Sequence, residues 1–184
     1  APQISCIGYD QVIDIIGRMP AEKVVVILDA CHSGGFKPKG AKAGPGTLVN
    51  RAFRDQWDAA KGRPLLLSSG ADQVSWEDKD GRHSVFTKFL LRGLRGEADL
   101  DGNAIVGFSE LADYLEDEVA AYTRQNFPSV QTPTRRYDSV EFNGDIPLAV
   151  NRPRWDAIQQ ELWNARTSAL SGSLMRRDME AFSV

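Results

Sequence analysis

A continuous aliphatic stretch that ends in chemically reactive side chains constrains this chain more than any other feature. Residues 24–28 read VVVIL, and DACHSGG follows at once. A run of Val, Ile and Leu without polar alternation is typical of a strand covered on both faces, as a parallel strand between helices is. We therefore predict a buried strand over residues 23–30 that is central to the hydrophobic core.

Helical and strand patterns alternate along the rest of the chain. Because strands that alternate with helices stack in layers, the pattern predicts an α/β fold. The predicted elements are helices over 9–19, 84–96 and 108–122 (with Ser109 as a candidate cap), a buried strand within 63–72, a loop at 129–137, a short last strand within 144–150 and a helical tail over 152–183.

The carboxyl ends of the two buried strands carry the candidate chemistry. Residues 29–34 and 68–73 fall at the sheet edge where α/β proteins display their sites. Cys31 is well placed there as a nucleophile, but an ordinary thiol pKa of about 8.5 leaves little thiolate at neutral pH, so a base must help. The alternative is that Cys31 is a small buried core residue, as most free cysteines are.

Composition excludes several classes of protein. The chain has 184 residues, enough for one domain with a real core, and its net charge of −3 argues against a nucleic-acid surface. No apolar run approaches the length of a membrane span. Two cysteines are too few for a disulfide scaffold, which fits a reducing compartment, and we expect a cytoplasmic protein.

The DACHSGG motif resembles the active-site signature of the caspase-like cysteine peptidases, especially metacaspases and the bacterial orthocaspases. The stretches LLLSSGADQVSWE, GRHSVFTKFLLRGLRGEADLDGNAIVGFSELADYLEDEV and QTPT are similar to later parts of that domain. The resemblance implies a three-layer caspase-hemoglobinase fold, with a central, mostly parallel sheet flanked by helices. It implies the C-terminal part of the peptidase domain over residues 1–150 and an appended helical tail over 151–184.

The same resemblance implies that Cys31 is the nucleophile of a Cys–His dyad, with backbone N–H groups at Gly34 stabilising the oxyanion. The histidines of this chain, His32 and His83, match positions that are not the base. In the resembled family the dyad histidine lies about 50 residues before the cysteine, which falls upstream of residue 1. We therefore expect a fragment without the first strands, whose partner is an N-terminal piece of the same protein. The alternative is a pseudo-enzyme without its base.

Acidic side chains at the sheet edge indicate the substrate. Asp29 lies two residues before Cys31 and should face the same side of the strand, where a carboxylate suits Arg or Lys at P1, the residue before the cut bond. The resemblance supports that preference and places Asp72 as a second negative charge, although Asp72 is equally a turn residue. Ser68 and Ser69 are further candidates for the pocket. The basic loop 36–63 is a candidate self-cleavage segment or a plain solvated loop.

A cation-binding pattern stands apart from these residues. Asp99, Asp101, Asn103 and Glu110 fall at positions 1, 3, 5 and 12 of an EF-hand-type loop, whose oxygen ligands suit Ca²⁺. Ala104 stands where that loop wants glycine, which weakens the case. The alternative is a polar connection between helices, and no other cofactor is expected.

The sequence thus favours a cysteine endopeptidase that cleaves proteins after Arg or Lys, with a role in stress response, cell death or defence. The rival hypothesis is a non-catalytic module of the same fold that binds a partner. A thiol redox protein is a weak third hypothesis because no second cysteine lies near Cys31.

Overall fold

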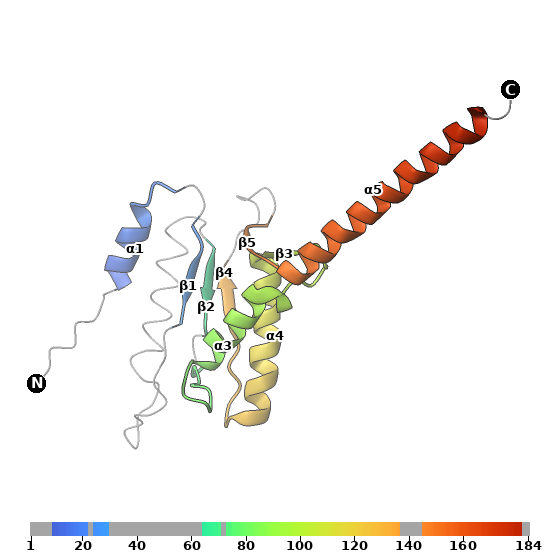
Figure 1. Cartoon of the computed structure of the whole chain (residues 1–184). Coiled ribbons are helices and arrows are strands. Elements are labelled where there is room, and N and C mark those ends of the chain that lie inside the picture. The colour runs from blue at the N-terminus through green and yellow to red at the C-terminus, as the bar shows by residue number, and fades with distance from the viewer. Residues whose placement is uncertain (1–8, 22–23, 30–63, 71–72, 137–144, 182–184) are drawn as a thin grey trace, which may run out of the picture.

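The computed structural model describes residues 9–21, 24–29, 64–70, 73–136 and 145–181 (Figure 1). Several predictions concern other parts of the chain. Cys31, His32, Gly34, the loop 36–63 and Asp72 lie outside the described residues.

A three-stranded sheet forms the centre of the described structure, in the order β1 (Val26–Leu28), β2 (Leu65–Leu67), β4 (Thr134–Arg136). β1 and β2 are parallel, and β2 and β4 are antiparallel. The predicted strands at both aliphatic runs are therefore confirmed. The β2 side chains are buried, whereas those of β1 are only half-buried. Val25 and Ile27 nevertheless pack against one hydrophobic cluster, and Val24, Val26 and Leu28 pack against another. The prediction of a strand covered on both faces is therefore confirmed, although its side chains are less buried than those of β2.

The segment TRR of QTPTRRY is a strand, so the prediction of a loop there was wrong. Arg136 pairs with Leu65 and Thr134 with Leu67, in antiparallel register. Its side chains show no apolar alternation, and the strand forms because β2 offers unpaired backbone groups on that side. Such a long-range pairing leaves no local signal in the sequence.

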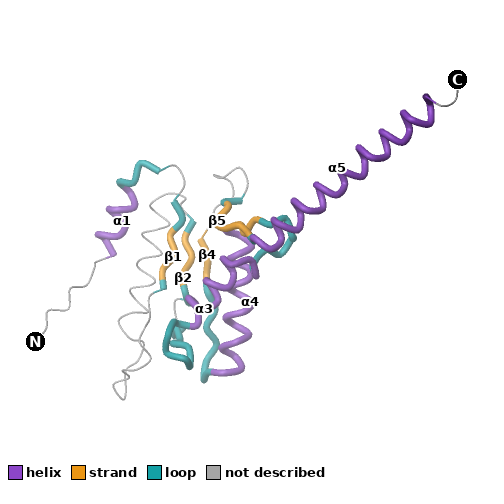
Figure 2. The backbone as a smooth tube through the Cα atoms, in the orientation of Figure 1, coloured by secondary structure: helices purple, strands orange, loops and turns teal. Residues whose placement is uncertain are grey.

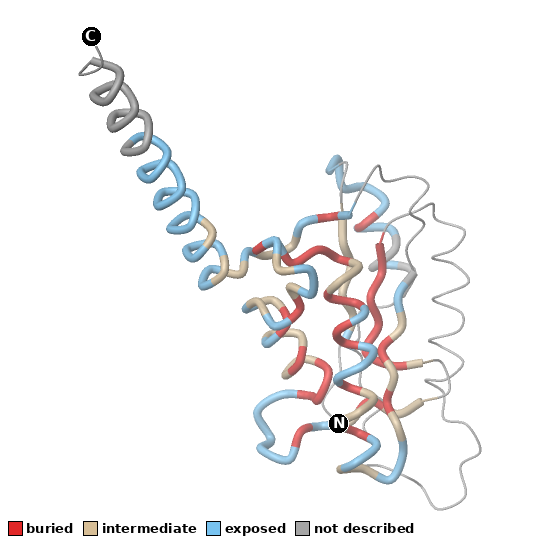
Figure 3. Tube along the Cα trace, turned by 90° about the vertical axis from the view of Figure 1, so that its right-hand side faces the viewer, coloured by how far each residue is buried: buried red, intermediate tan, exposed pale blue. Residues whose placement is uncertain are grey.

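Helices pack against both faces of β2, because successive side chains of a strand point to opposite faces. Leu65 and Leu67 pack with Ile16 of α1 (Tyr9–Gly17), the helix predicted over 9–19. Leu66 joins the larger core on the opposite face. That core is formed mainly by α3 (Val85–Arg92) and α4 (Phe108–Asn126), and it includes Val85, Phe86, Phe89, Phe108, Leu111, Leu115 and Val119 (Figure 3).

Helix α4 begins one residue before the predicted cap. Gly107 is its N-cap, and the Glu110 carboxylate accepts a hydrogen bond from the Gly107 N–H at 3.0 Å. Ser109 lies in the first turn of the helix, where its N–H donates a hydrogen bond to Asp145 Oδ2 at 3.0 Å. The prediction that Ser109 caps the helix was therefore wrong. The acceptor comes from a residue 36 positions away, which local sequence could not indicate.

The connection between α3 and α4 contains a short helical segment, η1 (Gly93–Glu97), and one strand of a small second sheet. β3 (Ile105–Gly107) pairs antiparallel with β5 (Pro147–Val150), the predicted last strand. The tail is one long helix, α5 (Arg152–Ala181), as predicted. It projects away from the rest of the molecule (Figures 1 and 2), and Leu162, Trp163 and Leu170 are exposed on it. None of the helices in the described part has the length and apolar character needed to span a membrane.

Candidate active site

The parallel pairing of β1 and β2 brings the ends of both strands to one edge of the sheet. Asp29 follows β1, and Ser68 and Ser69 follow β2. The Ser68 N–H donates to the Leu28 carbonyl at 3.0 Å, which extends the strand ladder to this edge. The described part of the predicted edge is thus assembled as expected.

The Asp29 carboxylate is exposed and is held by two hydroxyl groups at the beginning of α3. The Ser84 hydroxyl donates to Asp29 Oδ2, and the Thr87 hydroxyl donates to the same oxygen at 2.6 Å. No described residue donates to Asp29 Oδ1. This arrangement fixes the carboxylate through one of its two oxygens.

Ser84 serves Asp29 and the helix at the same time. It is the N-cap of α3, and its Oγ accepts a hydrogen bond from the Thr87 N–H at 2.9 Å. A hydroxyl can accept one hydrogen bond and donate another, so the cap remains free to donate to Asp29. Our sequence reasoning missed both hydroxyl groups. The serine of SVFT precedes a helical apolar pattern and so indicates an N-cap, but nothing local indicates its bond to Asp29, 55 positions earlier.

Ser68 and Ser69 are buried, with 3% and 4% of their surface exposed. The Ser68 carbonyl accepts a hydrogen bond from Gln131 Nε2 at 2.7 Å, and Gln131 is itself fully buried. The role of these serines in a substrate pocket stays a prediction. What the structure adds is Gln131, which sequence reasoning did not single out.

Gln131 holds the loop after β2 in place. Its Oε1 accepts the Trp76 N–H at 2.8 Å and its Nε2 donates to Ser75 Oγ at 3.2 Å. A second glutamine, Gln73, accepts the Thr132 N–H at 2.7 Å. The QTPT segment therefore positions the loop that continues from β2.

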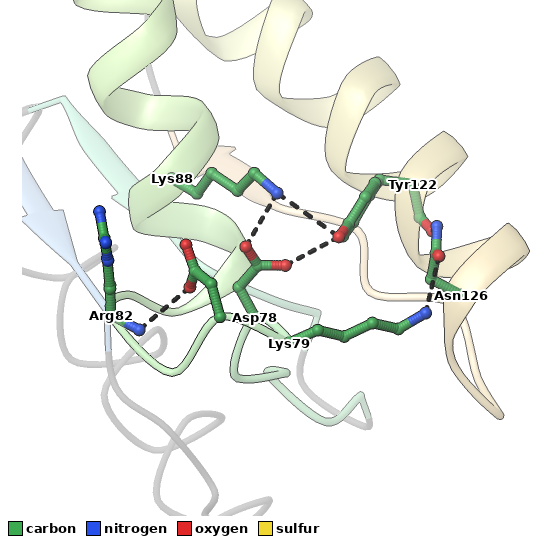
Figure 4. Close-up of polar contacts among 7 residues, drawn as sticks. Asp78, Lys79, Arg82, Lys88, Tyr122 and Asn126 are labelled. Atoms are coloured by element: carbon green, nitrogen blue, oxygen red, sulfur yellow. Dashed lines mark hydrogen bonds and ion pairs between the residues drawn. The ribbon is translucent and has the colours of Figure 1, made fainter.

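A charged cluster anchors the turn before α3 (Figure 4). Asp78, which is 6% exposed, accepts hydrogen bonds from Lys88 Nζ and from the Tyr122 hydroxyl, each at 2.8 Å. Burial raises the pKa of Asp78, but the bonds from Lys88 and Tyr122 lower it further than burial raises it, so it lies below its ordinary value. The bond to Asp78 likewise raises the pKa of Lys88 despite burial. Asp78 and Lys88 therefore both stay charged at neutral pH.

The turn that the Asp78 cluster anchors also positions Ser84 next to Asp29. The Asp78 N–H donates to the His83 carbonyl at 3.0 Å, and the Val85 N–H donates to the Trp76 carbonyl at 2.8 Å. Trp76 is partly buried and stacks on Phe127 with ring centroids 5.0 Å apart. The Asp78 cluster thus fixes the turn that presents Ser84.

One histidine, His83, lies within the described residues, and it is exposed in that turn. Its carbonyl bonds the backbone of Asp78, which is a structural role. The expectation that His83 is not the base stays a prediction, because Cys31 lies outside the described residues.

The acidic loop brings together three of its four predicted ligands. Asp99, Asp101 and Glu110 each place a carboxylate oxygen within 4.8 Å of the others. The Asn103 amide instead bonds Asp101, donating from Nδ2 to Asp101 Oδ2 at 2.8 Å. Ala104 adopts a left-handed backbone conformation with φ of 72°, so the sharp turn that glycine would favour forms with alanine.

Comparison with known proteins identifies the domain. A family model described as "Caspase domain" matches residues 3–138. Neither the curated proteins nor the solved structures include a significant match to the chain.

Proposed function

Because the chain belongs to the caspase-domain family, we propose that it is a cysteine endopeptidase that cleaves proteins after Arg or Lys. Membership of the family supports a cysteine peptidase on a caspase-like α/β fold. The preference for a basic residue rests on one observation, the exposed carboxylate of Asp29 at the carboxyl end of β1.

In the proposed reaction, Cys31 Sγ attacks the scissile carbonyl carbon and the thiol proton passes to an imidazole. Backbone N–H groups of Cys31 and Gly34 donate to the oxyanion. The C–N bond then breaks as the imidazolium returns the proton to the leaving amine. Water hydrolyses the resulting thioester and restores the thiol. The imidazole in this proposal belongs to a segment of the same protein upstream of residue 1.

Asp29 is the proposed acceptor for the basic side chain of the substrate. Two hydroxyls bind its Oδ2, so its Oδ1 can accept a hydrogen bond from a guanidinium or an ammonium group. The two hydroxyls also remove rotational freedom from the carboxylate before the substrate arrives, which lowers the entropic cost of binding. Asp72 is proposed to add a second negative charge to the same pocket.

Hydrolysis of fluorogenic peptides with Arg, Lys or Asp before the reporter tests the proposal, with the complete protein as the enzyme. We expect cleavage after Arg and Lys only, and none by Cys31→Ala. A hydrogen bond to a charged group is worth about 1.5–3 kcal/mol, so Asp29→Asn should lower kcat/KM for the Arg peptide by about 10–100-fold. The control Asp156→Asn alters an exposed carboxylate on α5 and should leave kcat/KM unchanged.

Two results would contradict the proposal. Cleavage after Asp would exclude an acidic pocket, and an unchanged kcat/KM in Asp29→Asn would exclude Asp29 as its acceptor. Mass spectrometry of the wild type and of Cys31→Ala would also show whether self-cleavage falls within residues 36–63.

A non-catalytic binding module is the second candidate. The observation that favours it is α5, which projects from the body and exposes Leu162 and Trp163. This function predicts that none of the peptides is cleaved by the complete protein, and that a natural partner is bound equally by the wild type and by Cys31→Ala.

A further inference from the structure

Three carboxylates converge in the loop between η1 and α4 without a cationic partner. Asp99, Asp101 and Glu110 place oxygens within 4.8 Å of one another. In the part of the chain that the structure describes, neither lysine nor arginine forms an ion pair with any of them. Among the described residues, the hydrogen bonds to these three carboxylates come from neutral amides, and the nearby Arg154 bonds the Gly102 carbonyl instead.

One oxygen of this cluster is buried and lacks any hydrogen-bond partner. Asp99 Oδ1 exposes less than 1 Å² and is the single buried side-chain atom of this kind among the described residues. A buried acceptor without a donor is unfavourable, and the cost is larger for an ionised group. Such an atom in a native site calls for an explanation, and an ion bound beside it supplies one.

The hydrogen bonds of the loop all fall on the other oxygen of Asp99, so Oδ1 has no partner among the described residues. Asp99 Oδ2 accepts the Ala104 N–H at 3.2 Å and Asn151 Nδ2 at 2.8 Å. The second bond comes from the residue just before α5, across the small sheet. The carboxylate is thus fixed by two donors on Oδ2, and Oδ1 is left for a ligand.

The other two carboxylates are fixed in the same manner. Glu110 Oε1 accepts the backbone N–H groups of Leu100 and Asp101 at 3.1 and 3.3 Å. Asp101 Oδ1 accepts the Asn103 N–H at 2.9 Å. Neutral donors orient these oxygens without cancelling their charge, which is the environment a cation requires.

We propose that Asp99, Asp101 and Glu110 bind one divalent cation, with Ca²⁺ preferred to Mg²⁺. Oxygens bound to one Ca²⁺ at about 2.3–2.6 Å lie at most about 5 Å apart, which accommodates the 4.8 Å limit of this cluster. All three ligands are carboxylates, which suit a hard cation. Ca²⁺ accepts irregular sets of oxygens completed by water, whereas Mg²⁺ demands near-octahedral geometry.

Calorimetric titration of the 184-residue chain with CaCl₂ after chelator treatment tests the site directly. We expect one Ca²⁺ per chain with a Kd below about 1 mM, and weaker binding of Mg²⁺. Asp99→Asn removes the charge of the buried ligand and should weaken Ca²⁺ binding at least about tenfold. The control Asp117→Asn removes an exposed carboxylate of α4 outside the loop and should bind as the wild type does.

A second variant is needed because Asp99 is partly buried, and Asp99→Asn could lose Ca²⁺ affinity simply by misfolding. Asp101 is exposed, so Asp101→Asn should keep the wild-type circular dichroism spectrum while also losing affinity for Ca²⁺. The proposal is overturned if the folded wild type binds no Ca²⁺, if Asp101→Asn binds it as tightly as the wild type, or if Mg²⁺ binds equally well. None of these readouts depends on peptidase activity.

Discussion

Lys88→Met tests whether the Asp78 cluster anchors the turn that presents Ser84 to Asp29. Methionine keeps the aliphatic length of the lysine stem and removes its ammonium group. That group donates to Asp78 at 2.8 Å and lies 4.5 Å from the centroid of the Tyr122 ring. The substitution therefore leaves a carboxylate whose side chain is 3% exposed without its cation, bonded by the Tyr122 hydroxyl and the backbone.

The expected loss of stability follows from this burial. Removing one partner of a buried ion pair costs about 3–5 kcal/mol, because the other charge remains uncompensated. The Lys88 side chain is 32% exposed, so water already screens part of the interaction. We expect the free energy of unfolding to fall by about 2–3 kcal/mol at pH 7, a value between those for exposed and buried pairs.

The loss should depend on pH in a defined direction. In the wild type the pKa of Asp78 lies below 3.8, so its stabilising contribution is complete above that pH and is lost as the pH falls through the lowered pKa. In Lys88→Met burial remains while a major opposing hydrogen bond is gone, so the pKa of Asp78 should rise and the folded variant should take up a proton first. The difference in stability between the two proteins should therefore shrink between pH 7 and about pH 4.

Urea denaturation followed by circular dichroism measures these differences. Lys79→Met is the matched control, because Lys79 is exposed and its ammonium group donates to Asn126 at 2.9 Å rather than to Asp78 (Figure 4). It should change stability by less than about 0.5 kcal/mol at either pH. The double variant Asp78→Asn/Lys88→Met removes the uncompensated charge and should be more stable than Lys88→Met alone. A loss equal to that of the control, or one independent of pH, would refute the reasoning.

Three further substitutions test other contacts. Gln131→Leu leaves buried backbone groups unpaired at the end of β2 and should lower the free energy of unfolding by about 2–4 kcal/mol in urea titrations; a loss below 1 kcal/mol would contradict this. Gly96→Ala should lower the free energy of unfolding by about 1–3 kcal/mol, because Gly96 has φ of 119° and an added Cβ would lie 2.6 Å from Asn151. The control Gly17→Ala meets no atom within 4 Å and should be neutral or slightly stabilising in the same assay. Thr87→Val removes one donor from the candidate substrate carboxylate, so the KM for the Arg peptide should rise about 2–10-fold with little change in kcat, and an unchanged KM would argue against a positioning role.

Local patterns were sufficient for most elements of the fold. The aliphatic runs predicted β1 and β2, and apolar side chains at helical spacing predicted α1, α3 and α4, because burial of a continuous or periodic apolar face dominates the formation of such elements. The DACHSGG motif was sufficient to place the chain in the caspase family, in agreement with the family model over residues 3–138.

Contacts between distant residues required the tertiary structure. β4 forms because β2 has an edge to pair with, and the cap of α4 shifted because Asp145 bonds its first turn. The sequence indicated Asp29 because it lies two residues before Cys31. The Ser84 and Thr87 hydroxyls that hold its carboxylate lie 55 and 58 positions further along the chain. Apolar periodicity reports on one element at a time, whereas hydrogen bonds across the fold depend on how the elements pack, so the acid was predictable and its supports were not.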